Sequence, residues 1–393
     1  MSSAEDEHKE EPEEEHEEEH EEEHEEEEEE EEASPAAAPV SRNPVTVHTD
    51  VVTDEMLAAA VAEGGGESLC LENVPHATGR LEAALAAYIC STATLRTLEL
   101  RHCQLYALDN FANGACAARL ERLDLRQNIL EGVRALGSAA FAATLRELDV
   151  SDNRLASLRG VDGLAQLRVL DASYNVLGHV GAHLGALTQL EELYLAENRL
   201  RATDWVAPLR RLRVLELGAN RIAALDPALA QLGALEALWL GRNRLATPAL
   251  AVFARPAPLG TALRRLSLQL NRLEALPVGA LAGLGGLTEL YLSENGLTTI
   301  AGVAQLPALR ILDVAQNRLA SLAGVEALPA LEEFWANDNR VADWDEVRRL
   351  RTARASLTVV YLEANPVAAD PTYRTQLREI LPNLTQIDSS FIK

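Results

Sequence analysis

Three histidines are the first residues whose type and spacing could support chemistry. His16, His20 and His24 lie four residues apart, and on one face of a helix their imidazoles would align as metal ligands. Residues 1–32, however, hold 22 acidic residues and one Lys, and like charges four residues apart oppose a helix. We therefore interpret this segment as a solvated, disordered polyanion and expect no metal site in it.

The other reactive residues form no catalytic motif. The four cysteines (Cys70, Cys90, Cys103 and Cys116) make no CxxC pair and no Cys/His metal spacing. Ser, His and Asp are present, but without a nucleophile motif or a phosphate-binding loop. We expect reduced cysteines, no cofactor and no enzyme activity.

Charge is concentrated at one end of the chain. The 393 residues carry a formal net charge of −26, of which residues 1–32 supply −21 (22 acidic residues and one Lys), leaving −5 for the rest. The N-terminus lacks the basic stretch and the apolar core of a secretory signal. The sequence also contains no run of 18 apolar residues, the length that a membrane span needs. We expect a soluble protein of the nucleus and cytoplasm.

A short motif recurs along most of the chain. The pattern L-x-L-x-x-N returns every 22 to 28 residues, and each unit predicts one short strand and a return path. Stacked units bury the alternating leucines and build a parallel sheet on the concave side of a solenoid. This pattern is the leucine-rich-repeat signature. The units end at Cys103, Asn128, Asn153, Asn175, Asn198, Asn220, Asn243, Asn271, Asn295, Asn317, Asn339 and Asn365.

The repeat predicts the whole architecture. We expect an α/β leucine-rich-repeat solenoid, a curved right-handed horseshoe with a parallel concave sheet, a convex side of α and 3-10 helices, and a C-terminal cap. The predicted segments are a disordered acidic tail with a Pro/Ala linker (1–45), an N-terminal cap with a degenerate repeat (46–91), the repeats (92–365) and the C-terminal cap (366–393). The motif asparagines should lie inside the solenoid and form hydrogen bonds with the backbone of the neighbouring turn.

The residue between the two leucines of each motif should face the concave surface, because side chains alternate along a strand. Eleven of these twelve residues are acidic or aromatic, and five are aromatic although aromatic residues make up only 4% of the chain. Such a face predicts binding of a protein with a basic patch, and its acids would repel nucleic acid. We call these residues the concave column: Glu99, Asp124, Asp149, Asp171, Tyr194, Glu216, Trp239, Ser267, Tyr291, Asp313, Trp335 and Tyr361.

One stretch of the column carries a second acid. In LEEFWANDN, residues 331–339, Trp335 belongs to the concave column and Glu333, two residues earlier, faces out beside it. Strands about 4.8 Å apart place Asp171 and Tyr361 roughly 38 Å from each other. A surface of this length fits a globular domain better than a short peptide.

The C-terminal motifs make the resemblance specific. LEEFWANDN, VYLEANP (360–366) and YRTQLREILPNLTQID (373–388) closely resemble the end of the leucine-rich-repeat regulators of protein phosphatase 1, the regulatory subunit 7 family. The resemblance extends over about residues 92–393. The third string is also found in some relatives of that family, whereas the first two are more particular to it.

The resemblance implies a non-catalytic regulator that is a monomer when free and binds the catalytic subunit of protein phosphatase 1, with inhibitor 3 as a possible third partner. It implies no nucleic-acid or membrane partner. A structural scaffold, axonemal or ribonucleoprotein, that binds another basic protein is the alternative. The site that the resemblance implies, with Tyr291 added from the concave column, is Asp171, Tyr194, Glu216, Trp239, Tyr291, Asp313, Glu333, Trp335 and Tyr361.

Overall fold

The computed structural model describes residues 66–392 except 75–78, 81–82, 110–118 and 139, together with the single positions 58 and 62. The predicted tail and linker (1–45), with the three histidines, lie outside these residues. The chain divides into two units, Met1–Asn43 and Pro44–Lys393. All helices and strands named below belong to the second unit.

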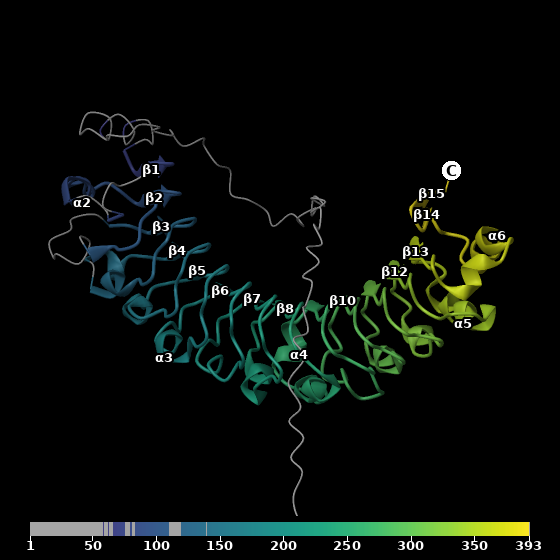
Figure 1. Ribbon diagram of the computed structural model, residues 1–393. Coiled ribbons are helices and arrows are strands. Elements are labelled where there is room, and N and C mark those ends of the chain that lie inside the picture. The colour runs from purple at the N-terminus through teal and green to yellow at the C-terminus, as the bar shows by residue number, and fades with distance from the viewer. Residues whose placement is uncertain are drawn as a thin grey trace, which may run out of the picture. The chain divides into compact units, whose positions relative to one another are not determined.

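One 15-stranded sheet runs through this unit, with its strands in chain order. Neighbouring strands are parallel, as in the pair β6 and β7, except for the antiparallel pair β14 and β15 at the C-terminal end. The strands line the inner side of an arc and the helices its outer side (Figure 1), so the predicted leucine-rich-repeat solenoid is confirmed. The strands are β1 (Ser68–Glu72), β2 (Thr97–Arg101), β3 (Arg122–Asp124), β4 (Glu147–Asp149), β5 (Val169–Asp171), β6 (Glu192–Tyr194), β7 (Val214–Glu216), β8 (Ala237–Trp239), β9 (Arg265–Ser267), β10 (Glu289–Tyr291), β11 (Ile311–Asp313), β12 (Glu333–Trp335), β13 (Val359–Tyr361), β14 (Gln386–Ile387) and β15 (Ser390–Phe391).

Short helices return the chain from one strand to the next. No helix among the described residues is long and apolar enough to cross a bilayer. The α-helices are α2 (Ala83–Ser91), α3 (Gly181–Leu184), α4 (Leu259–Ala262), α5 (Trp344–Arg348) and α6 (Tyr373–Ile380). The 3-10 helices are η2 (Arg134–Ser138), η3 (Ala140–Ala143), η4 (Val161–Gly163), η5 (Pro227–Gln231), η6 (Thr247–Phe253), η7 (Ala301–Gln305), η8 (Val325–Ala327), η9 (Arg349–Ala353) and η10 (Pro366–Ala369).

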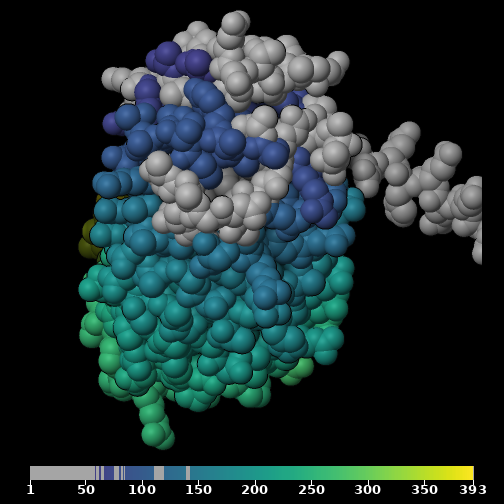
Figure 2. Space-filling model, turned by 90° about the vertical axis from the view of Figure 1, so that its left-hand side faces the viewer, coloured from purple at the N-terminus to yellow at the C-terminus, as the bar shows by residue number. Residues whose placement is uncertain are grey.

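A single hydrophobic core runs along the solenoid, because each repeat buries its leucines against those of the next. Figure 2, which faces the left-hand side of Figure 1, shows the repeats coloured blue, teal and green packed as successive layers. The predicted degenerate repeat contributes β1, which extends the sheet beside β2. The core is therefore built from contacts between neighbouring repeats.

The motif asparagines join neighbouring repeats, as predicted. The side-chain amide of Asn220 donates to the carbonyl of Leu195 in the preceding repeat (2.8 Å) and to that of Leu217 in its own (3.1 Å), and its oxygen accepts from the amide of Leu200 (2.9 Å). All of these atoms are buried, so the ladder satisfies backbone groups that the tight turn would leave unpaired.

Different residues continue the ladder at its two ends. At the first repeat, the Cys103 thiol lies 3.4 Å from the carbonyl oxygen of Leu71. At the cap, a carboxylate oxygen of Asp388 accepts from the amide of Leu362 (2.9 Å) and from the hydroxyl of Tyr373 in α6 (3.2 Å). Asp388 therefore ties the C-terminal cap to the last repeat.

The cysteines do not all match the sequence expectation. Cys70 and Cys103 are free and buried. Cys90, in α2, is disulfide-bonded, so the prediction that all four cysteines are reduced is wrong for Cys90. Sequence spacing could not show this, because it does not say which cysteines the fold brings together.

Candidate functional site

The structure places all nine predicted site residues on the inner side of the sheet. In each three-residue strand from β3 to β13 the central residue is buried and the two flanking side chains point the other way; in β12, for example, Phe334 is buried whereas Glu333 and Trp335 are partly exposed. Asp171, Tyr194 and Glu216 lie side by side in register on β5, β6 and β7. Eight of the nine predicted residues therefore form one row, interrupted only by Ser267 on β9, and Glu333 lies in the neighbouring row between Ile311 and Val359.

This row is less exposed than the sequence predicted. Trp335 and Glu333 were expected to be exposed in the free protein but are half-buried, and Asp313 is 7% exposed. The cause is packing along the row, because strands about 4.8 Å apart leave little room between large side chains. A partner would therefore contact edges and tips of these residues rather than whole side chains.

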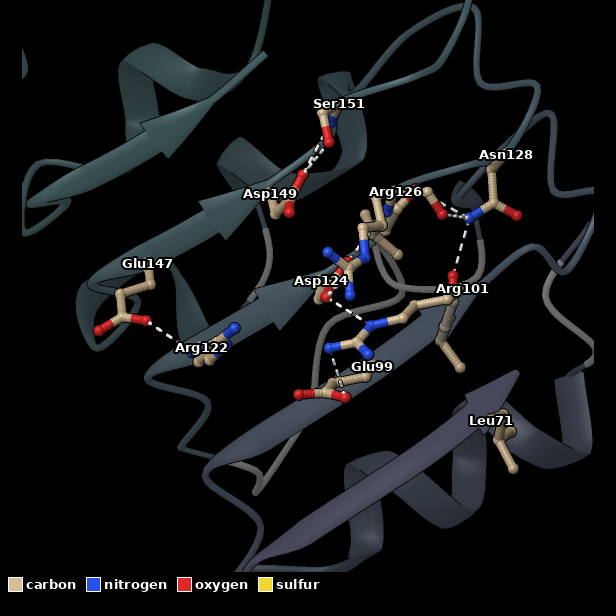
Figure 3. Close-up of polar contacts among 12 residues, drawn as sticks. Leu71, Glu99, Arg101, Arg122, Asp124, Arg126, Asn128, Glu147, Asp149 and Ser151 are labelled. Atoms are coloured by element: carbon tan, nitrogen blue, oxygen red, sulfur yellow. Dashed lines mark hydrogen bonds and ion pairs between the residues drawn. The ribbon is translucent and has the colours of Figure 1, made fainter. Parts of the chain in front are cut away.

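At the N-terminal end of the column the acids are neutralised within the protein. The guanidinium of Arg101 lies 2.8 Å from a carboxylate oxygen of Glu99 and 2.6 Å from one of Asp124, and Arg126 lies 3.6 Å from the same Asp124 oxygen. Figure 3 shows this network on neighbouring strands. Asp124 is 1% exposed, so these ion pairs are structural and leave little charge for a partner.

Further along the column the carboxylates have no cationic partner among the residues that the structure describes. Asp171 accepts the backbone amide of Ser173 (2.9 Å), Glu216 accepts that of Gly218 (3.0 Å) and Asp313 repeats the pattern. These bonds orient the carboxylates but do not cancel their charge. This part of the column is thus the one that can attract a basic protein.

Burial changes the acidity of these groups. It raises the pKa of Asp171 to about 6 and that of Glu216 to about 7, and it also raises the pKa of Asp149 and Asp313. The negative charge of neighbouring acids adds to the effect at Asp171. A lysine or arginine brought close by a partner would stabilise the ionised forms.

Four of the five aromatic residues of the concave column form two pairs. Trp239 and Tyr291 stack with ring centroids 6.3 Å apart, and Trp335 meets Tyr361 edge to face at 6.2 Å. The indole Nε1 of Trp335 is buried and has no hydrogen-bond partner among the described residues. An unpaired buried donor costs about 1–3 kcal/mol, so this arrangement is not explained by the stability of the fold.

Charged residues outside the predicted site also line the inner face, among them Arg265 and Glu289. Arg265, at the start of β9, lies 5.9 Å from the ring centre of Trp239 and pairs through two nitrogens with Glu289. Both precede the first leucine of their motif, and that position faces the same side as the concave column. The charges of Arg265 and Glu289 cancel each other. The negative charge of the inner face therefore comes from the unpaired carboxylates. Among the described residues, no group of His, Cys, Asp and Glu is placed to hold a metal ion.

Comparison with known proteins supports the repeat and points to one group of regulators. A family model described as leucine rich repeat matches residues 261–319. Protein phosphatase 1 regulatory subunit 7 of Bos taurus and of Homo sapiens are each 44% identical to this chain over 50 residues, and that of Danio rerio is 42% identical. The match covers 13% of this chain and 14% of those relatives, much less than residues 92–393.

Solved structures match over a larger part of the chain. A leucine-rich-repeat protein of Leptospira interrogans has a TM-score of 0.57 at 22% identity, covering 86% of this chain and 93% of its own. An internalin from Listeria monocytogenes has a TM-score of 0.58 at 18% identity, covering 88% and 91%. At these identities the similarity concerns the fold alone. The chain is a leucine-rich-repeat solenoid whose inner face is suited to protein binding.

Proposed function

We propose that this protein is a non-catalytic regulatory subunit that binds the catalytic subunit of protein phosphatase 1 through its concave column. The observation that carries the proposal is the row of unpaired carboxylates and paired aromatic rings along the inner face. Large aromatic residues ringed by polar groups dominate interface energies. The short match to regulatory subunit 7 proteins supports the choice of partner.

The roles proposed for the site residues follow from their chemistry. Asp171, Glu216 and Glu333 attract a basic patch on the phosphatase, and Trp239, Tyr291, Trp335 and Tyr361 provide apolar anchors. In the row, Tyr194 lies between Asp171 and Glu216, and Asp313 lies between Tyr291 and Trp335. The free protein is a monomer, acts in the nucleus and cytoplasm, and accepts inhibitor 3 as a third component of the complex.

Affinity capture tests the choice of partner. The tagged full chain is used as bait in a cell lysate, and bound proteins are identified by mass spectrometry. Enrichment of the phosphatase catalytic subunit by the wild-type chain, and its loss with Glu333→Ala/Trp335→Ala, supports the proposal. Capture of axonemal or ribonucleoprotein components without the phosphatase would favour a structural scaffold instead.

A further inference from the structure

Arginines lie in two files along the solenoid. The first file consists of those arginines, at or just before the start of a strand, that pair with a glutamate of the next repeat: Arg96, Arg122, Arg168, Arg213, Arg265 and Arg310. Arg213 lies 3.0 Å from Glu236, and Arg310 lies 2.7 Å from Glu332. The charge of this file is therefore cancelled within the protein.

The second file follows the ladder asparagines, beyond the carboxyl ends of the strands. All of its members are exposed, and none makes a side-chain hydrogen bond or ion pair with another residue that the structure describes. No contact among the described residues therefore depends on the charge of these arginines. We call this file the arginine rim: Arg154, Arg199, Arg221, Arg244, Arg272, Arg318 and Arg340.

Backbone hydrogen bonds set the spacing of the rim. The amide of Arg221 donates to the carbonyl of Leu200, the residue after Arg199, at 2.8 Å, and Arg244 and Arg272 make the same contact one and two repeats later at 2.9 Å. Segments joined in this way lie about 5 Å apart. Four guanidinium groups therefore stand on successive repeats over a length of roughly 15 Å.

Nearby acids do not neutralise this part of the rim. Residues 197–201, 219–223, 242–246 and 270–274 together contain six Arg and two Glu. One of the two, Glu197, lies 3.6 Å from Arg242, which is outside the rim. The segment is a local patch of positive charge on a chain whose net charge is −26.

We propose that the arginine rim is a second interaction surface, which binds an acidic peptide segment of a partner protein. Guanidinium groups bind carboxylates through two parallel hydrogen bonds, so a file of unpaired arginines suits a peptide that presents successive Asp or Glu side chains. This proposal goes beyond phosphatase binding, because it does not depend on which protein occupies the concave column.

The surroundings of the rim favour a peptide over a nucleic acid. Single-stranded nucleic acid binds best where aromatic rings offer stacking platforms for the bases. The exposed residues two positions after the rim arginines are mostly small, including Ala223, Ala246, Ala320 and Ala342. The negative charge of the whole chain would also slow the approach of a long polyanion. A short acidic peptide responds mainly to the local patch.

A fluorescein-labelled polyglutamate peptide is the probe, and its binding is measured by fluorescence anisotropy. The rim variant is Arg221→Glu/Arg244→Glu. The control is Arg351→Glu/Arg354→Glu, which makes the same charge change at two exposed arginines in and after η9. The full chain and the chain from Pro44 are both tested, because the 22 acidic residues in positions 1–32 could compete with the probe. Circular dichroism checks that every variant is folded.

We expect the peptide to bind at least one of the two forms, with an affinity that falls as salt is raised. The rim variant should weaken binding by about tenfold or more, whereas the control should bind like the wild type. No binding to either form, or an equal loss in both variants, would overturn the proposal. So would tighter binding of a single-stranded oligonucleotide of the same charge.

Discussion

Trp239 and Tyr291 stack across an intervening strand, with ring centroids 6.3 Å apart and an angle of 19° between the ring planes. Ser267 lies in register between them on β9 and is 1% exposed. A small residue at this position lets the two rings meet. The pair therefore presents one joined aromatic surface in the middle of the concave column.

Removal of one ring tests this surface. We expect Tyr291→Ala to weaken binding of the phosphatase catalytic subunit by about 1–3 kcal/mol, because an aromatic anchor and its stacking partner are both disturbed. Isothermal titration calorimetry measures the change. Tyr291→Phe is the matched control: it keeps the ring, loses only the hydroxyl contact to Glu289, and should bind nearly as the wild type. Equal losses in the two variants would show that the ring surface is not the anchor.

Stability should depend on the asparagine ladder. Asn220→Ala removes the bonds to Leu195, Leu217 and Leu200 and strands buried backbone groups, so we expect a loss of roughly 1–3 kcal/mol in the free energy of unfolding. Urea denaturation measures it. Asn337→Ala, whose amide bonds only the exposed Asp338 side chain, should change the midpoint little. An unchanged midpoint in Asn220→Ala would refute the role of the ladder.

The Arg101–Asp124 ion pair should be structural. Arg101→Met leaves Asp124 buried with only the more distant Arg126 nearby, and we expect a destabilisation of about 2–4 kcal/mol. Adding Asp124→Asn should recover part of this loss, because one unpaired charge is gone while Glu99 still lacks its arginine partner.

The control for this pair is an exposed one. Arg122→Met breaks the exposed ion pair with Glu147 and should cost less than about 1 kcal/mol. Chemical denaturation compares all three variants. If Arg101→Met cost no more than Arg122→Met, the Asp124 network would not be structural.

The unpaired carboxylates predict how stability changes with pH. In the folded protein, burial raises the pKa of Asp171 from its ordinary 3.8 to about 6 and that of Glu216 from 4.5 to about 7. The folded state holds these protons more tightly than the unfolded chain. Their contribution to stability is therefore fully present below about pH 4 and is lost as the pH rises through about 6 and 7.

Urea denaturation of the free protein checks this sign. We expect the midpoint to fall between about pH 5 and about pH 8, and to fall less in Asp171→Asn/Glu216→Gln, which has no carboxylate at either position. Circular dichroism at each pH shows that the starting state is folded. A midpoint that rose equally over this range in both proteins would contradict the raised pKa values.

The fold was predictable because the same short sequence pattern recurs in each repeat. Leucine spacing determines which side chains are buried, and the motif asparagine determines the turn, so each unit could be interpreted without its neighbours. The concave column followed from strand alternation alone. Arg265 and Glu289 were missed although the same alternation applies to them, because apart from Glu333 only the residue between the two leucines was considered.

Contacts between repeats were harder to predict. The stack of Trp239 on Tyr291 skips a strand, and the Arg101 ion pairs depend on how far a flexible side chain reaches. The half-burial of Trp335 depends on the size of its neighbours in the row, and the Cys90 disulfide depends on the path of the chain. None of these features leaves a periodic signal in the sequence.

The double variant Glu333→Ala/Trp335→Ala tests most directly whether the inner face of the solenoid binds the phosphatase. Both side chains lie on β12 and point to that face, so the fold should survive their removal. Titration calorimetry with the purified catalytic subunit should show a loss of about 2–4 kcal/mol in binding free energy, with an unchanged circular dichroism spectrum. Glu379→Ala, an exposed change on α6, should bind as the wild type does. Wild-type affinity in the folded double variant would contradict binding through the concave column.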